Sequence, residues 1–204
     1  RATLDHGMIP TVHYYTKSLD TILDDLKRVA DIIAAKQTLV QFNTLPPSNE
    51  VLRRVKQVYL GVIFKVAVSN KKSPEGGYAV WSGKDVEDVQ QGSVTILVEK
   101  VRKRKDCIDY AMFDPSHGTN SSLDLNSDSL AIRFGREIIS DRDLGHLGII
   151  FAGGINPRNV ATLKKILHDY LPRDRVSIDL ESGVRKDDCL DLALVRDYLL
   201  NNCR

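Results

Sequence analysis

The chain has 204 residues, of which 42% are hydrophobic and 27% are charged, a balance that favours a folded globular protein and excludes a disordered one. Its 29 basic and 27 acidic residues are interspersed and leave a net charge of +2, so the chain has no field for general nucleic-acid or membrane binding. We expect a single domain over residues 1–204, with residues 1–8 as a leader of unclear role.

The cysteines and the apolar runs indicate in which cellular compartment the protein is expected. Cys107, Cys189 and Cys203 are too few and too widely spaced for a disulfide framework or a zinc site, so we expect a reducing compartment and no bound metal. No stretch approaches the ~20 apolar residues of a membrane span. The basic cluster KVRKRKD at 100–106 is interpreted as the solvated end of a helix. We therefore expect a cytoplasmic protein without a nucleic-acid or membrane partner.

Strand-like and helix-like segments alternate along the chain. The predicted strands are IPTVHYY from 9, TLVQFN from 38, GVIFKVAVS from 61, CIDYAMFD from 107, GIIFAGG from 148 and RVSIDLESG from 175. The helical segments are LDTILDDLKRVADIIAA from 19, SNEVLRRVKQVYL from 48, VTILVEKVRKRK from 94, LAIRFGREIIS from 130, residues 157–169, and DCLDLALVRDYLLNN from 188. Six such βα units predict a parallel sheet, either open and doubly wound or closed as a (β/α) barrel.

Two strand-to-helix junctions are rich in small residues. Gly153 and Gly154 follow the first of these strands, with Asn156 predicted as the N-cap and Pro157 at the first helical position. The glycines suit either a tight turn or a bound phosphate, because glycine lets a ligand approach the backbone and helix starts attract anions. Residues 182–183 follow the next strand, and two neighbouring junctions of this kind favour the phosphate site.

Both candidate folds place ligands at the carboxyl ends of their strands. The residues at these ends are Asn43, Ser69, Asp114, Gly153, Gly154, Ser182 and Gly183.

Five segments, in chain order, resemble strands of one enzyme family. They are TVHYYTKSLDTIL from 11, LVQFN from 39, DYAMFDPSHGT from 109, FAGGINPRNV from 151 and IDLESGVRKDD from 178, and they resemble the third, fourth, sixth, seventh and eighth strands of phosphoribosylanthranilate isomerase. That family implies an α/β fold, the (β/α)8 TIM-type barrel of tryptophan biosynthesis, with six βα units recognisable from residue 9 onward.

The resemblance also implies roles for individual residues. The substrate phosphate would be held by Gly153, Gly154, Ser182 and Gly183. Asp114 would be the general acid of an Amadori rearrangement, which opens the ribose ring and then moves a proton from C2. Asp179, midway along its strand, would line the barrel beneath the ligand, and Gly118 and Thr119 would line the substrate. No metal or organic cofactor is expected, because proton transfers suffice.

The chain departs from the family at the general base. The family's cysteine, in a Lys-x-Cys-Gly motif, and its carboxylate-binding arginine have no counterpart ahead of MIPTVHYY. Cys107 would lie at the opposite face, Cys189 just inside the last helix and Cys203 at the tail; His117 replaces a glycine. Two alternatives therefore stay open: an inactive barrel that binds a phosphorylated ligand or serves as a scaffold, and another ribose-phosphate barrel isomerase. The oligomeric state is not predicted.

Overall fold

The computed structural model of the chain describes residues 9–14, 20–42, 47–66, 93–115, 123–180, 182–187 and 189–202. Its central sheet has six strands, all parallel, in the order β1-β2-β3-β4-β5-β6. The strands are β1 (Thr11–Tyr14), β2 (Leu39–Phe42), β3 (Gly61–Lys65), β4 (Tyr110–Phe113), β5 (Gly148–Phe151) and β6 (Val176–Ile178).

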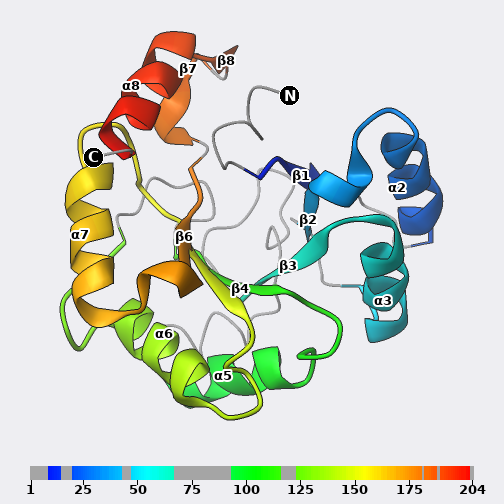
Figure 1. The fold of residues 1–204 in the computed structure, drawn as a ribbon, viewed down its shortest axis with the longest axis horizontal. Helices are drawn as coiled ribbons and strands as arrows, with labels where there is room; N and C mark the ends of the chain where they lie inside the picture. The colour runs from blue at the N-terminus through cyan, green and yellow to red at the C-terminus, as the bar shows by residue number, and fades with distance from the viewer. Residues whose placement is uncertain are drawn as a thin grey trace, which may run out of the picture.

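Helices follow the strands and cover the convex side of the curved sheet (Figure 1). They are α2 (Ile22–Ala30), α3 (Asn49–Val58), α5 (Val94–Arg102), α6 (Leu130–Ser140), α7 (Val160–Tyr170) and α8 (Leu192–Asn202). Shorter elements are η1 (Ala35–Gln37), η2 (Arg173–Arg175), η3 (Ser182–Val184) and a hairpin of β7 (Arg185–Lys186) with β8 (Cys189–Leu190). Within the described ranges, no helix is long and apolar enough to cross a bilayer.

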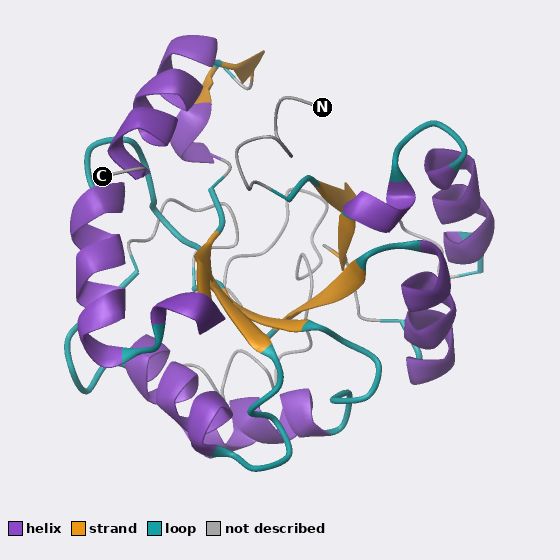
Figure 2. Ribbon diagram, viewed as in Figure 1, coloured by secondary structure: helices purple, strands orange, loops and turns teal. Residues whose placement is uncertain are grey.

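The strand order decides between the two folds that the sequence allows. In a doubly wound sheet the order reverses partway across, whereas here each strand pairs with the next one in the chain. The sheet curls so that its two edge strands, β1 and β6, face each other across an open side (Figure 2). The prediction of a barrel-type fold with six βα units is confirmed as a curled, six-stranded part-barrel.

Side chains alternate between the two faces of the sheet, as the period of a strand requires. One set packs beneath the helices and includes Val40, Phe42, Val62, Phe64, Ala111, Phe113, Ile149 and Phe151. The other set fills the concave interior and includes Leu39, Ile63, Met112, Ile150 and Ala152. The alternation thus fixes which residues can reach a ligand inside the curve.

Two of the predicted helix starts are wrong. Asp191 accepts hydrogen bonds from the N–H groups of Ala193 and Leu194, so α8 begins after it and Cys189 lies in β8 rather than inside the helix. The helix after β5 begins at Val160, one turn later than predicted. Asn156 caps the turn before it, where its Oδ1 accepts from the N–H of Arg158 at 2.9 Å.

The basic cluster at 100–106 is only partly solvated. Helix α5 ends at Arg102 and Lys103 is exposed, as predicted. The guanidinium of Arg104, however, stacks 4.6 Å from the centre of the Phe64 ring, and burial lowers its pKa. The interpretation as a wholly solvated helix end is therefore wrong for Arg104, whose side chain packs onto the back of β3.

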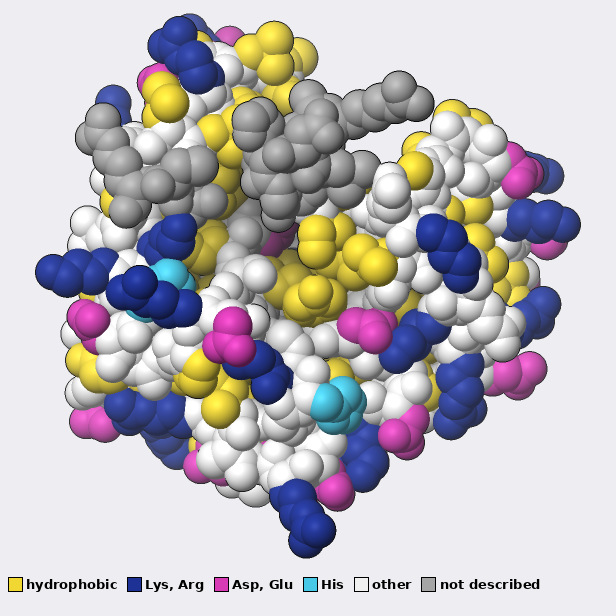
Figure 3. All heavy atoms as spheres, viewed as in Figure 1, with side chains coloured by type: hydrophobic (Ala, Val, Ile, Leu, Met, Phe, Trp, Pro, Cys, Tyr) yellow, Lys and Arg dark blue, Asp and Glu magenta, His cyan; other side chains and the backbone are white. Residues whose placement is uncertain are grey.

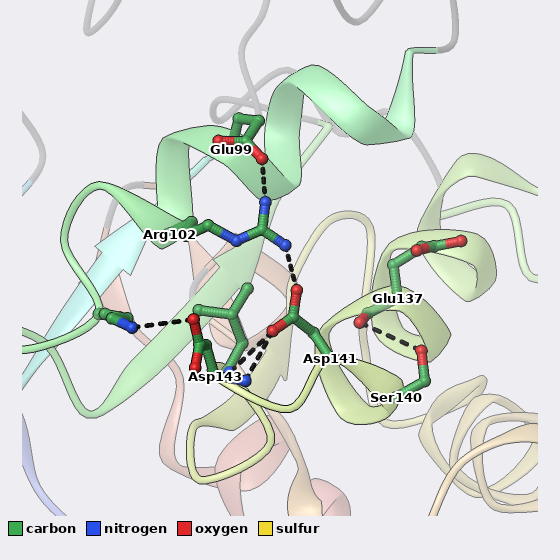
Figure 4. Close-up of polar contacts among 8 residues, drawn as sticks. Glu99, Arg102, Glu137, Ser140, Asp141 and Asp143 are labelled. Atoms are coloured by element: carbon green, nitrogen blue, oxygen red, sulfur yellow. Dashed lines mark hydrogen bonds and ion pairs between the residues drawn. The ribbon is translucent and has the colours of Figure 1, made fainter.

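An ion-pair network ties α5 to the loop after α6 (Figure 4). Arg102 binds both Glu99 and Asp141. Asp141 also accepts from the N–H groups of Asp143 at 2.8 Å and Leu144 at 3.2 Å. The hydrogen bond from the Asp143 N–H lowers the pKa of Asp141 below its usual value, and the bond from Arg102 makes the second-largest contribution.

Candidate functional site

Polar side chains gather at the carboxyl ends of the strands, on the concave side of the sheet. Alternation with the helix-facing residues places His13, Gln41, Lys65, Asp114 and Asp179 on that side. Gln41, Lys65 and Asp114 are buried there, beyond the apolar layer formed by Leu39 and its neighbours. Because barrel folds bind ligands at this end of the strands, this polar layer is the candidate site.

Lys65 and Asp114 form a buried ion pair within this layer. Lys65 ends β3, Asp114 follows β4, and Lys65 Nζ lies 2.5 Å from Asp114 Oδ2. Each side chain is only 8% exposed. Two charges this far from water are retained only when each neutralises the other. Asp114 was predicted for the site and Lys65 was not, although a lysine inside the apolar strand GVIFKV was a usable signal.

The glycine junction after β5 has the backbone geometry that glycine permits. Gly153 has φ 111° and Gly154 has φ 62°, both in the region that side chains disfavour. The Asn159 side chain holds the turn from both ends, because its Nδ2 donates to the Gly154 carbonyl at 2.9 Å and its Oδ1 accepts from the Asn156 N–H at 2.8 Å. This role of Asn159 was not predicted from the sequence.

The second junction lies directly against the first. A Cβ built on Gly183 would stand 1.9 Å from the Ile155 carbonyl oxygen and 2.9 Å from the Asn156 Cα. The structure therefore brings together the two loops in which the four predicted phosphate-binding residues lie. Asp114 is one strand away, since the Phe113 carbonyl accepts from the N–H of Ala152, the residue before Gly153, at 3.0 Å.

Asp179 lies at the end of β6 instead of midway along a strand, because β6 stops at Ile178. Its Oδ1 is 4.0 Å from Nε2 of His13 on the opposite edge strand, so these two side chains approach across the open side of the sheet. Burial, followed by the charge of Asp179, raises the pKa of Tyr198 on α8 to about 12.

A cavity of about 420 Å³ opens beside Asp179, and its lining runs from β1 to β6 and on to α7 and α8. Leu39, Ile63 and Ile150 form much of its apolar wall, and Figure 3 shows hydrophobic side chains gathered in the hollow within the curve of the sheet. His168 also lines this cavity, and burial with the nearby cations Arg173 and Lys164 lowers its pKa. The cavity thus presents an apolar wall with ionisable groups at its edge.

Some predicted positions fall outside the described ranges. These are Asn43, Ser69, His117, Gly118, Thr119 and Cys203. Cys107 is buried ahead of β4, at the amino end of the strands, as expected. Among the residues that the structure describes, no group of His, Cys, Asp or Glu side chains is placed to hold a metal ion.

One curated relative resembles nearly the whole chain, and a second resembles a third of it. The chain is 24% identical over 195 residues to N-(5'-phosphoribosyl)anthranilate isomerase of Methanococcus aeolicus, and the match covers 95% of this chain and 75% of the relative. A shorter match, 34% identical over 67 residues, is to the enzyme of the same name from Acetivibrio thermocellus and covers 33% of this chain and 28% of that relative. No protein-family model matches the chain.

Solved structures of the same enzyme share the fold. The isomerase from Pyrococcus furiosus has a TM-score of 0.52 and 19% identity, and the match covers 96% of this chain and 74% of that one. The isomerase from Thermus thermophilus has a TM-score of 0.54 and 14% identity, with coverages of 96% and 72%. This chain therefore shares the fold of these two enzymes, and the shared part spans 74% and 72% of their lengths.

Proposed function

Because the chain belongs to the phosphoribosylanthranilate isomerase family, we propose that it catalyses the Amadori rearrangement of N-(5-phosphoribosyl)anthranilate to the carboxyphenylamino-deoxyribulose phosphate. The observation that carries the proposal is the convergence of two features at one end of the sheet. The paired glycine junctions lie against each other after β5 and β6, and Asp114 lies on the neighbouring strand.

The paired junctions serve as the phosphate anchor in this proposal. Backbone N–H groups of residues 153–155, in the turn after β5, and of residues 182–184, in η3, supply the donors that a phosphate needs. Gly153, Gly154 and Gly183 leave the backbone uncovered by side chains, and Ser182 adds the fourth predicted residue. The partner is thus a small phosphorylated sugar, with no nucleic acid or membrane involved.

Asp114 occupies the position of the general acid in this proposal. Opening the ribose requires a proton on the ring oxygen as the bond from C1 to that oxygen breaks, and a group within hydrogen-bonding reach supplies it. Asp179 follows β6 on the concave side of the sheet, and in this proposal it lines the ligand space, the role that the resemblance gives it. No cofactor takes part, because the reaction moves only protons and electron pairs of the substrate.

The test compares two aspartates at opposite ends of one strand. Asp114→Asn is expected to lower turnover by ~10²–10⁴-fold while leaving ligand affinity within about tenfold. Asp109→Asn is the matched control, because Asp109 lies at the amino end of β4 and also pairs with a lysine, Lys56, at 3.0 Å. Its turnover should match the wild type. Equal turnover of Asp114→Asn and the wild type would remove Asp114 from the mechanism.

A second candidate function is a catalytically inactive barrel that binds a phosphorylated ligand or serves as a scaffold. It is favoured by one observation: neither of the two cysteines in the described part of the chain, Cys107 and Cys189, lies at the carboxyl end of a sheet strand. A wild-type protein that binds the phosphoribosyl ligand without converting it would support this candidate. Conversion of a different ribose phosphate would support the related barrel isomerase instead.

We also propose a cytoplasmic location. Cys107 and Cys189 are both free thiols, and free thiols persist in reducing compartments. Cell fractionation with an antibody to the protein tests this, and recovery from an oxidising compartment would contradict it.

A further inference from the structure

The side chain of Asn159, the N-cap residue of α7, reaches back over the turn that follows β5. We infer that Asn159 is a positioning residue for the substrate phosphate, because it orients the Ile155 N–H for the anion and sets the backbone surface on which the second junction packs. It acts through the turn and does not touch the ligand itself. This role rests on the proposed function, which places the phosphate at the two junctions.

The first bond of Asn159 fixes the peptide group between Gly154 and Ile155. Its Nδ2 donates to the Gly154 carbonyl at 2.9 Å. No peptide bond among the described residues is cis, and the C=O and N–H of a trans peptide group point in opposite directions. The Ile155 N–H is therefore directed away from Asn159, and it remains available to an anion held at the junction.

The second bond fixes the next peptide group along the chain. Asn159 Oδ1 accepts from the Asn156 N–H at 2.8 Å, so the Ile155 carbonyl of that peptide group points away from Asn159. This carbonyl is the group that meets the second junction, where a Cβ on Gly183 would stand 1.9 Å from its oxygen. One side chain thus sets both the donor of the first junction and the contact between the two junctions.

The start of α7 does not supply the donors itself, because its N–H groups nearest the turn are engaged. Those of residues 158–160 all donate to Asn156, the first to its Oδ1 at 2.9 Å and the next two to its carbonyl oxygen at 3.2 and 3.1 Å. Pro157 has no N–H. No hydrogen bond within the described part of the chain is donated by the N–H groups of residues 153–155. A phosphate at this junction therefore depends on the turn that Asn159 holds.

The test compares substrates with and without the phosphate. Serine is also a favoured N-cap, so Asn159→Ser keeps the start of α7, but its side chain is too short to bond both Gly154 and Asn156. We expect the Kd for inorganic phosphate, measured by calorimetry, to rise at least about tenfold. The kcat/KM for N-(5-phosphoribosyl)anthranilate should fall by a similar factor, whereas that for N-ribosylanthranilate, which lacks the phosphate, should stay within about twofold.

Asn156→Ser is the matched control, because the Asn156 side chain bonds mainly the Arg158 N–H and reaches the Gly154 carbonyl only at 3.4 Å. Its phosphate affinity should stay within about twofold of the wild type. Unchanged phosphate affinity in Asn159→Ser would overturn the inference. Equal losses of kcat/KM on both substrates would do so too, because they would show a merely structural role.

The calorimetric measurement separates this inference from the proposed activity. A wild-type protein that binds phosphate without isomerising the substrate overturns the proposed activity alone, and weaker phosphate binding by Asn159→Ser then still supports the positioning role. A wild-type protein that does not bind phosphate overturns both the anchor and the role of Asn159.

Discussion

Gly183 packs against the Ile155 carbonyl so closely that a Cβ on Gly183 would lie 1.9 Å from that oxygen. The neighbour is backbone and cannot rotate away, so Gly183→Ala must push the two junctions apart. We expect affinity for inorganic phosphate to fall at least about tenfold, because the anchor needs N–H groups from both loops. Isothermal titration calorimetry with phosphate measures this.

The control for this substitution is Gly145→Ala, in the loop at the amino end of β5. There a Cβ would lie 3.1 Å from the Asp141 carbonyl, a contact that a small shift relieves. Phosphate affinity should equal that of the wild type. If Gly183→Ala binds phosphate as well as this control does, the anchor does not depend on the contact between the junctions.

A sulfate or phosphate ion in a crystal should lie between residues 153–154 and 182–183. Most of its contacts should come from backbone N–H groups, because neither turn itself carries a lysine or arginine. A crystal structure determined in concentrated phosphate tests the position directly. An ordered ion elsewhere, with this site empty, would count against the anchor.

Removing one member of the buried ion pair should destabilise the fold more than removing both. Lys65→Met leaves the Asp114 carboxylate buried without its cation, which costs about 3–5 kcal/mol. The double variant Lys65→Met/Asp114→Leu should recover most of that loss, because apolar side chains of similar volume often replace a buried pair at little cost. Urea unfolding measures the free energies, and equal losses in the single and double variants would show that the pair does not couple.

Stability should fall in acid partly because of Asp141. Its pKa is lower in the folded protein than the unfolded value of 3.8, so its contribution is present above about pH 4 and is lost as pH falls further. Asp141→Asn should flatten the decline of unfolding free energy below pH 4, whereas Asp143→Asn, two positions further along the loop, should not. An unchanged acid decline in Asp141→Asn would contradict the network of Figure 4.

The sequence predicted the sheet because its signals are local. Runs of apolar residues located all six strands. Ser48 and Ser129 mark where α3 and α6 begin, because each side chain accepts a hydrogen bond from the backbone N–H of the residue three positions later. The start of α8 was misplaced because the apolar residues around Cys189 fit either a helix or a strand. In the structure, the turn at Asp187, with φ 52°, forms the hairpin, and the cap at Asp191 begins the helix after it.

The site was only partly predictable for a different reason. Glycine permits backbone angles and close backbone contacts that other residues disfavour, so Gly153 and Gly183 could be found from their positions after two strands. The pairing of Lys65 with Asp114 depends on residues 49 positions apart that meet only when β3 and β4 align. The approach of His13 to Asp179 depends on how far the whole sheet curls, which no local pattern encodes.

Product identification tests the central claim most directly. The natural protein is incubated with N-(5-phosphoribosyl)anthranilate labelled with carbon-13 at ribose C2, and the carbon spectrum is followed over many turnovers. Isomerisation converts C2 from a carbinol to a ketone, so the account predicts that the label moves to a carbonyl signal in the wild type and in Asp109→Asn, and only slowly in Asp114→Asn. A wild-type protein that leaves the label in the carbinol signal while binding the substrate would contradict the proposed activity.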